Sequence, residues 1–366
     1  MRLLICAGGT GGGVYPALSV LDVLGNRISE ILWVGSEGGM EADLVTRRNI
    51  PFRAIPAAGL HGVGLRSLPG NLTRLVKGER ASRKILADFQ PDVLFFTGGY
   101  VAAPMAFAGR RFPITLYVPD IEPGLALKFL ARFADAIALS AEESRPFFKS
   151  HKNTVVTGYP IRSDFHRVPQ AQAKESLGLT ESKSMILVYG GSKGARSINQ
   201  AVLANLPSLL AEYQVVHLTG QLDWESVKAA TTNLNKDLRA NYFPFPYLHE
   251  EMGTALAAAD LVVCRAGAST LGELPFFDLP AILVPYPYTW RYQKVNADHL
   301  VNAGGAVILE DENLPVQLIG KIKELLADKT RLENMVASMG AIARPEAARM
   351  IADLILETAR GKEKLS

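Results

Sequence analysis

Two glycine-rich turns, about half a chain apart, have the residue types needed to hold an anion. They span residues 7–13 and 190–196, and each follows a short apolar run and precedes a helical pattern. Glycine lets main-chain N–H groups approach a ligand closely, while the following helix supplies unpaired donors and the positive end of its dipole. The candidate ligand-binding residues in these turns are Thr10, Gly11, Gly12, Gly13 and Ser192. Either turn alone could be only a sharp connection, but two at corresponding places favour phosphate binding.

A third string, residues 264–274, combines small residues with an acidic one at an expected strand-to-helix junction. Its candidate ligand-binding residues are Arg265, Ala268, Ser269, Thr270 and Glu273. A diphosphate can rest on the main-chain N–H groups of such a junction, and the Glu273 carboxylate can accept from both hydroxyls of a ribose. A lone glutamate near a helix start is usually only a favourable dipole partner. Here the whole string favours the ligand-binding interpretation.

Neither turn has a common nucleotide fingerprint. The first lacks the Gly-Lys-Ser/Thr ending of a Walker loop and the second has Lys193 before Gly194, which disfavours a P-loop NTPase. Neither has the G-x-G-x-x-G spacing, followed by an acidic residue, that indicates a dinucleotide. The six histidines form no cluster at metal-ligand spacing, so we expect no metal and no cofactor. We interpret four conspicuous residues as structural, namely His217, His249, Trp224 and Trp290.

Composition predicts two globular domains. The 366 residues are 48% hydrophobic and 20% charged, which is enough for two cores. A net charge of +3 gives no electrostatic case for nucleic-acid binding. Cys6 and Cys264 lie in apolar runs, so we expect them to be buried and reduced. Because the start has no room for a cleavable signal and no run of about 18 residues lacks charges, Pro and Gly, we expect a cytoplasmic protein without a membrane-spanning helix.

Short apolar runs alternate with helix-length segments along the chain. The expected strands are residues 3–6, 31–34, 93–96, 114–117 and 136–139, then 185–189, 215–218, 261–264 and 281–284. The alternation implies parallel sheets, and runs apolar at every position fit strands covered by helices on both sides. Turn residues at 158–165 indicate a linker. The prediction is an α/β protein with two Rossmann-like doubly wound domains, residues 1–160 and 165–342, facing each other across a cleft.

Many strings in the right order match one family. They are residues 8–12, 35–37, 98–101, 124–126, 131–135, 157–162, 190–196, 265–268 and 293–297. With them the chain resembles, over nearly its whole length, the MurG-type family of bacterial glycosyltransferases, family 28. The resemblance implies the GT-B fold and inverting transfer of N-acetylglucosamine from UDP-N-acetylglucosamine to undecaprenyl-diphospho-muramyl-pentapeptide in peptidoglycan synthesis. It also implies an N-terminal domain for the acceptor, a C-terminal domain for the donor, and a last helix, about 345–366, that packs back on the first domain.

The resemblance also assigns roles around the donor. The matching residues are Ser192 and Arg162 near the diphosphate, Glu273 at the ribose, Gln293 and Asn296 at the sugar, and Tyr247 and Leu248, with a looser local match, at the uracil. The family stabilises the leaving UDP with helix dipoles and hydrogen-bond donors, which implies no bound metal.

The acceptor half departs from the family. Gly13 stands where the family has a histidine, and residues 117–120, Tyr-Val-Pro-Asp, stand where it has His-Glu-Gln-Asn. Transfer to a sugar hydroxyl needs a base, or at least a hydrogen-bond acceptor, beside the attacking oxygen. We therefore hypothesise that Asp120 is the base. The alternative is that Asp120 only caps a turn before Pro123 and Gly124.

A basic amphipathic segment, residues 65–84, bears on membrane contact. Its leucines at helical spacing, with two of the cations around them, are Leu65, Leu68, Leu72, Leu75, Arg74 and Lys77. An apolar stripe flanked by cations suits anionic lipid headgroups, whereas an ordinary helix would place these leucines in the core. The family docks this region on the membrane, so we favour peripheral contact with the cytoplasmic surface of the cell membrane.

Three alternatives to this transferase stay open. The departures at Gly13 and Asp120 favour a related transferase with a different lipid or a small-molecule acceptor. A nucleotide-sugar 2-epimerase shares a UDP site, although the sequence shows no convincing set of acid and base residues for it. The third alternative, from a non-enzyme class, is a UDP-sugar-binding protein without turnover.

Overall fold

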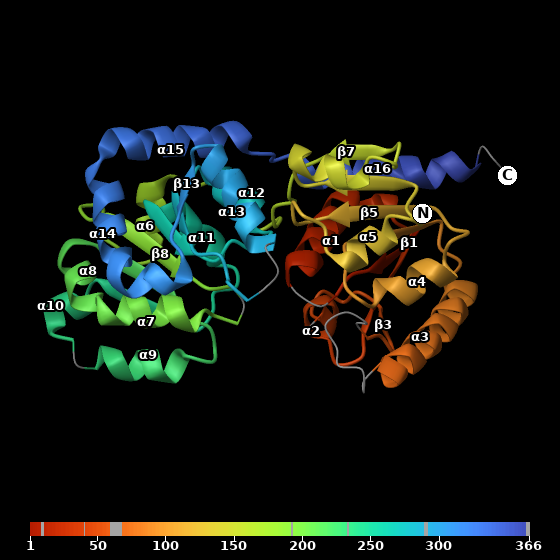
Figure 1. Ribbon diagram of the computed structural model, residues 1–366, viewed down its shortest axis with the longest axis horizontal. Helices are drawn as coiled ribbons and strands as arrows, with labels where there is room; N and C mark the ends of the chain where they lie inside the picture. The colour runs from red at the N-terminus through yellow and green to blue at the C-terminus, as the bar shows by residue number, and fades with distance from the viewer. Residues whose placement is uncertain are drawn as a thin grey trace. The chain divides into compact units, whose positions relative to one another are not determined.

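The computed structural model describes residues 1–8, 11–39, 41–58, 68–191, 193–232, 234–288 and 292–363, and of residues 68, 69, 362 and 363 only the backbone. Thr10, Leu65, Ser192 and Trp290 therefore lie outside the described residues, as does the Leu68 side chain. The chain divides into two compact units, Met1–Arg162 with Pro345–Ser366, and Ser163–Arg344 (Figure 1).

The first unit contains a seven-stranded sheet in the order β3-β2-β1-β4-β5-β6-β7, in which all neighbouring strands pair in parallel. Its strands are β1 (Arg2–Cys6), β2 (Glu30–Ser36), β3 (Phe52–Ile55), β4 (Val93–Phe96), β5 (Ile114–Val118), β6 (Ala136–Leu139) and β7 (Thr154–Val156). Its helices are α1 (Gly11–Leu24), η1 (Gly25–Arg27), α2 (Glu41–Thr46), α3 (Leu68–Phe89), α4 (Ala102–Ala108), α5 (Leu125–Leu130), η3 (Glu142–Phe148) and α16 (Ala347–Glu363).

The last helix, α16, completes the first unit although it follows the second unit in sequence. It packs against α1 and against β4, β5 and β6, and Figure 1 shows it beside β5. Ala347, Ile351 and Ile355 are fully buried and recur every four residues, which gives the helix one apolar side. Strands β4, β5 and β6 are buried at every position because helices cover both sides of the sheet.

The second unit repeats this architecture with a six-stranded sheet in the order β10-β9-β8-β11-β12-β13, again parallel throughout. Its strands are β8 (Met185–Tyr189), β9 (Gln214–Leu218), β10 (Tyr242–Phe245), β11 (Leu261–Cys264), β12 (Ala281–Leu283) and β13 (Ala306–Ile308). Its helices are α6 (Gln170–Ser176), α7 (Arg196–Ala204), α8 (Leu206–Glu212), α9 (Trp224–Thr231), α10 (Lys236–Arg239), α11 (Met252–Ala258), α12 (Thr270–Phe276), α13 (Tyr292–Asn302), η4 (Asp311–Asn313), α14 (Leu314–Ala327) and α15 (Lys329–Ile342).

The nine strands expected from the sequence are all present, so the prediction of two doubly wound sheets is confirmed. Four further strands, β3, β7, β10 and β13, were not predicted, and they are the four edges of the two sheets. Cys6 and Cys264 are buried free thiols, as expected. Within the described residues, no helix has both the length and the apolar character needed to cross a bilayer.

Candidate functional site

In the second unit, the adjacent strands β8 and β11 end side by side. Tyr189 ends β8 and pairs in register with Cys264, which ends β11. The chain goes from β8 to β9 on one side and from β11 to β12 on the other, so the sheet order reverses here. Ligands of open α/β sheets bind at such a switch point, outside the carboxyl ends of the strands. The second glycine turn and the string after Cys264 both begin at this place.

The second glycine turn is pressed against the loop that follows β9. Gly194 has a φ of +79° and Gly220 a φ of +77°. A Cβ on Gly194 would lie 2.2 Å from the carbonyl oxygen of Thr219, and one on Gly220 would lie 2.5 Å from the Gly194 Cα. By contrast, a Cβ on Gly191 would meet nothing within 4 Å. The close approach therefore requires glycine at 194 and 220, while the main chain at Gly191 has open space beside it.

The string after β11 makes a tight turn into α12. The Thr270 hydroxyl donates to the carbonyl oxygen of Gly267 at 2.6 Å, and a Cβ on Gly267 would meet nothing within 4 Å. The amide of Glu273 donates to the Ser269 carbonyl oxygen at 2.9 Å, which sets Glu273 in the first turn of the helix. Burial raises the pKa of Cys264 to about 12, and the charge of Glu273 adds to this rise. The carboxylate is thus close to the end of β11, whereas Ala268 is buried in the turn.

Arg265, which the sequence places among ligand-binding residues, holds loops of the second unit together. It is 8% exposed, and its Nη1 donates to the carbonyl oxygen of Val284 at 3.1 Å and to Asp311. Its Nη2 donates to the Ser197 hydroxyl at 2.8 Å. The guanidinium also lies over the ring of Tyr286, 5.2 Å from its centroid. One side chain therefore joins the ends of β11 and β12 to α7 and η4.

Ser197 and Asp311, the side-chain partners of Arg265, were not among the residues predicted from the sequence. Ser197 lies in the first turn of α7, directly after the glycine turn, and its hydroxyl donates to Asp311 at 2.8 Å. The polar residue in that turn was a usable signal, but Asp311 lies 114 residues further along the chain. Only the folded sheet brings the two together.

Helix α13 is tied to the same loops by the two residues expected at the sugar. Asn296 is fully buried and donates from Nδ2 to the carbonyl oxygen of Ala266 at 3.2 Å. Gln293 accepts at Oε1 from the main-chain amide of Tyr286 at 2.9 Å. Both residues thus fix the position of α13 against the ends of β11 and β12, which adds a structural role to the one expected from sequence.

Tyr247 and Leu248 reach the carboxyl edge of the same sheet because they follow β10. Leu248 is buried, whereas Tyr247 is half-buried and packs edge-on against His249 with ring centroids 4.7 Å apart. Because β10 was not among the expected strands, the position of these two residues after the edge strand of the sheet could not be predicted.

The first unit has its own switch point, between β1 and β4. Gly99, in the loop after β4, has a φ of +86°, and a Cβ there would lie 2.7 Å from the carbonyl oxygen of Gly8. In the same loop the Thr97 hydroxyl donates to the carbonyl oxygen of Gly13 at 2.7 Å. Gly11, Gly12 and Gly13 form the first residues of α1. The first glycine turn is thus held closely by the loop after β4.

The two departures from the family are neighbours in the structure. Tyr117 is fully buried, shares a hydrogen bond of 2.7 Å with the Ser140 hydroxyl, and packs edge-on against Tyr159. Tyr159 in turn donates from its hydroxyl to the carbonyl oxygen of Gly12 at 3.4 Å. Aromatic packing therefore links the end of β5 to the first turn of α1, next to Gly13.

Asp120 is half-buried and lies just after β5. Burial raises the pKa of Tyr117 well above its ordinary value, and the charge of Asp120 adds to this rise. The carboxylate is therefore near the Tyr117 ring, at the carboxyl edge of the first sheet.

Arg162, the last residue of the first unit before the chain enters the second, lies over the ring of Tyr15 in α1 at 5.1 Å.

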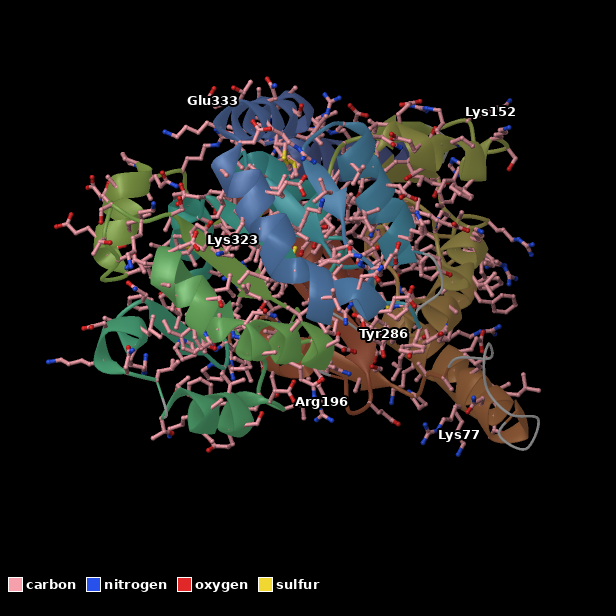
Figure 2. The ribbon with its side chains drawn as sticks, turned by 60° about the vertical axis from the view of Figure 1, so that its left-hand side comes forward. Lys77, Lys152, Arg196, Tyr286, Lys323 and Glu333 are labelled. Atoms are coloured by element: carbon pink, nitrogen blue, oxygen red, sulfur yellow. The ribbon has the colours of Figure 1, made fainter. Side chains whose placement is uncertain are left out.

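Helix α3 exposes apolar side chains together with cations. Leu72 is 58% exposed and Val76 is 47% exposed, Leu75 is half-buried, and Arg74 and Lys77 are exposed. The buried side of the helix is made instead by residues further along, Ser82, Ile85 and Leu86. Lys77 is labelled on this helix in Figure 2.

Exposed aromatic side chains occur on the helices that follow α3 in the packing, since α3 packs on α4 and α4 on α5. Phe107 of α4, Phe129 of α5 and Phe147 of η3 are all more than a third exposed. Arg110 lies over the ring of Phe107 and Lys128 over that of Phe147, both at 5.2 Å. We call the following residues the apolar-cationic surface: Leu72, Arg74, Leu75, Val76 and Lys77 of α3, Phe107 of α4 and Arg110 after it, Lys128 and Phe129 of α5, and Phe147 of η3.

No group of three or more histidines, cysteines or carboxylates suited to a metal ion occurs in the part of the chain that the structure describes. His217, interpreted from sequence as structural, is fully buried between Tyr242 and Asn199.

Comparison with known proteins gives the same assignment in both halves. Residues 3–139 match the model of the glycosyltransferase family 28 N-terminal domain, and residues 185–353 match that of the C-terminal domain. A relative from Desulforamulus reducens is 38% identical over 95% of this chain and 96% of its own length. A relative from Listeria welshimeri is 37% identical over 97% of this chain and 99% of its own length. Both are named UDP-N-acetylglucosamine–N-acetylmuramyl-(pentapeptide) pyrophosphoryl-undecaprenol N-acetylglucosamine transferase.

Among solved structures, MurG of Acinetobacter baumannii superimposes with a TM-score of 0.76 and 25% identity, covering 97% of this chain and 99% of that one. Two Rossmann-like units, each with a glycine turn at its switch point, match the GT-B fold, and the family models and relatives give the class as glycosyltransferase. The chain belongs to glycosyltransferase family 28. The resemblance seen in the sequence strings is therefore confirmed.

Proposed function

We propose that this family 28 enzyme transfers N-acetylglucosamine, with inversion, from UDP-N-acetylglucosamine to undecaprenyl-diphospho-muramyl-pentapeptide. This reaction belongs to peptidoglycan synthesis, and hence to cell-wall biogenesis, cell shape and division. The names of the relatives support both the donor and the lipid-linked acceptor. One structural observation carries the proposal. Gly191 and Gly267 lie in the two turns at one switch point, and a Cβ on either glycine would meet nothing within 4 Å, so both main chains have open space beside them.

We assign the donor to the second unit. Main-chain amides of the two turns, including those of Ala268 and Ser269, stabilise the diphosphate as UDP leaves, without a metal, while the Thr270 amide holds the turn itself by donating to the Gly267 carbonyl oxygen at 3.0 Å. The dipole of α7 adds to this stabilisation. The other groups we assign are Ser192 and Arg162 to the diphosphate, Glu273 to the ribose hydroxyls, Tyr247 and Leu248 to the uracil, and Asn296 and the amide nitrogen of Gln293 to the sugar.

We assign the acceptor to the first unit, where the sequence departs from the family. Asp120 is our candidate for the base that accepts the proton of the attacking hydroxyl, because a carboxylate there is the one gain of basic function among the altered residues. We assign the acceptor's diphosphate to Gly11, Gly12 and Gly13 at the start of α1, and Thr10 to the same group from the sequence alone.

We further propose that the enzyme works at the cytoplasmic face of the cell membrane as a peripheral protein. The apolar-cationic surface supports this location, because exposed leucine and phenylalanine side chains can enter the headgroup region while arginine and lysine pair with anionic lipid. The composition of the chain supports no role for nucleic acid.

The direct experiment incubates the enzyme with radiolabelled UDP-N-acetylglucosamine and the lipid-linked muramyl acceptor, and looks for the labelled disaccharide lipid. The matched variants are Glu273→Gln and Glu225→Gln, the second removing an exposed carboxylate from α9. We expect Glu273→Gln to raise KM for the donor about tenfold, the effect of losing one good ligand hydrogen bond, while Glu225→Gln changes nothing. Equal KM values in the two variants would remove Glu273 from the site.

Three other outcomes correspond to the alternatives. Label that moves only to another lipid or a small molecule indicates a different acceptor. Appearance of the 2-epimer of the donor indicates an epimerase. Tight UDP binding, measured by calorimetry, without turnover on any acceptor indicates a binding protein.

A further inference from the structure

The side chains at the start of α7 are used to hold the loop that follows β9. Asn199 donates from Nδ2 to the carbonyl oxygen of Thr219 at 2.8 Å and to Asp223 Oδ2 at 2.9 Å. Arg196, labelled in Figure 2, donates from Nε to Asp223 Oδ1 at 3.2 Å. Asn199 and Thr219 are buried, whereas Arg196 is largely exposed. Asn199 thus hydrogen-bonds to both ends of the Thr219–Asp223 loop, and Arg196 hydrogen-bonds to one end.

His217 completes the hydrogen bonding of the Asn199 amide, and that amide sets the tautomer of the ring. Because a carbonyl and a carboxylate can only accept, the NH2 group of Asn199 must face Thr219 and Asp223. The Oδ1 of Asn199 therefore faces His217 Nε2, at 2.9 Å, and this nitrogen must carry the proton. The other ring nitrogen, Nδ1, then accepts from the Tyr242 hydroxyl at 2.8 Å. The hydrogen bonds run in one direction, from β10 through β9 to α7.

The ring of His217 is neutral in this arrangement. Each ring nitrogen has one partner, and in the neutral ring with the proton on Nε2 the lone pair of Nδ1 accepts from the Tyr242 hydroxyl. The imidazole is fully buried, and burial lowers the pKa of His217 to about 3. A neutral imidazole with a single tautomer makes the direction of the network fixed across physiological pH.

The network ends at the glycine turn of the donor site. The carbonyl oxygen that accepts from Asn199 is that of Thr219, and it is the atom against which the Gly194 main chain packs. A change in the Asn199 amide would release Thr219, and Gly194 would lose the surface that holds the turn in place. The position of the turn therefore depends on a ring that does not itself touch it.

We propose that His217 is a positioning residue for the donor diphosphate, acting through Asn199 and Thr219 on the Gly190–Ala195 turn. The inference depends on the proposed function, because it takes that turn as the place where the diphosphate of UDP-N-acetylglucosamine binds. It goes beyond that function because it gives a buried residue an effect on donor affinity, although Asn199 and Thr219 lie between this residue and the turn.

Two substitutions at the same position test the inference. A glutamine amide extends about as far as Nε2 of histidine, so His217→Gln can still donate to Asn199. An asparagine amide extends only about as far as Nδ1, so His217→Asn can bond to Tyr242 and not to Asn199. Tyr242→Phe is the matched control, because it removes the bond at the far side of the ring and keeps the one to Asn199.

The measurements are the affinity for UDP by calorimetry and the midpoint of thermal unfolding of each full-length variant. We expect His217→Asn to bind UDP about tenfold more weakly than the native enzyme, while His217→Gln and Tyr242→Phe bind within about twofold of it. All three should lower the unfolding midpoint, since each disturbs a buried polar group.

Equal UDP affinities for the Gln and Asn variants, both folded, would overturn the proposal and leave His217 a purely structural residue. If His217→Asn does not fold, Asn199→Asp takes its place. It keeps an acceptor for Nε2 and loses both donors to the loop, so it must weaken UDP binding for the proposal to stand. Failure of the native enzyme itself to bind UDP would instead contradict the proposed function.

Discussion

The hydroxyl of Thr97 donates a hydrogen bond of 2.7 Å to the carbonyl oxygen of Gly13, in the first turn of α1. A Cβ on Gly13 would lie 3.2 Å from that same hydroxyl oxygen. The loop after β4 is therefore fitted to a glycine at position 13, where the resemblance to the family implies a histidine. Any larger residue there requires Thr97 to move by a few tenths of an ångström.

Two glycines in this region predict different costs of substitution. Gly99→Ala puts a Cβ 2.7 Å from the Gly8 carbonyl oxygen at a φ of +86°, so we expect the free energy of unfolding to fall by about 1–3 kcal/mol. Gly13→Ala meets only a side chain that can adjust, and alanine is favoured over glycine in a helix by about 1 kcal/mol. We therefore expect Gly13→Ala to change the free energy by less than Gly99→Ala. Urea unfolding of both variants measures this, and equal losses would contradict it.

Asp120→Asn predicts a loss of turnover without a loss of donor binding. If Asp120 is the base, its removal should lower kcat about 100-fold or more, while the calorimetric affinity for UDP stays unchanged because we assign Asp120 to the acceptor and not to the nucleotide. Introducing an imidazole by Gly13→His in the Asp120→Asn background should restore part of the rate. Near-normal turnover of the Asp120→Asn single variant would contradict a role as base and would favour the alternative, that Asp120 only caps a turn.

Because His217 is buried as a neutral ring, we expect the folded protein to lose stability in acid. Burial lowers its folded-state pKa to about 3 from an ordinary value of 6.5. Between these values the unfolded chain binds a proton that the folded protein excludes. The contribution of this group is therefore constant above pH 6.5 and falls by about 1.4 kcal/mol per pH unit as the pH drops from 6.5 toward 3.

The comparison that isolates this contribution is the free energy of unfolding of the native enzyme and of His217→Gln between pH 4 and pH 8. The carboxylates titrate alike in both proteins, so their effect cancels in the difference. The stability difference should favour the variant increasingly at lower pH. A difference that does not change with pH would show that His217 titrates normally in the folded protein.

The apolar-cationic surface predicts a specific effect on membrane binding. Leu72→Asp removes an exposed apolar side chain of α3 and adds a negative charge, so we expect affinity for vesicles containing anionic lipid to fall at least about tenfold. Val316→Asp is the matched control, because Val316 is 83% exposed on α14 in the second unit. Vesicle sedimentation of both variants measures the effect, and equal losses would place the contact elsewhere.

The strands that the sequence predicted and those it missed differ in how they are covered. The nine predicted strands include every interior strand of both sheets, where cover on both sides demands apolar residues throughout. The four missed strands are sheet edges, which have one neighbour and tolerate polar residues and proline. Arg53 in β3 and Pro244 in β10 interrupt the apolar pattern for this reason.

By itself, the sequence determined that this chain forms two parallel α/β sheets with glycine turns at corresponding strand ends, because those features depend on local composition and spacing. Tertiary structure alone decided which polar side chains bond to protein. Arg265 reaches Asp311 across 46 residues, and His217 reaches Asn199 and Tyr242 across 18 and 25 residues. Such contacts depend on strand order in the folded sheet, which local pattern does not encode.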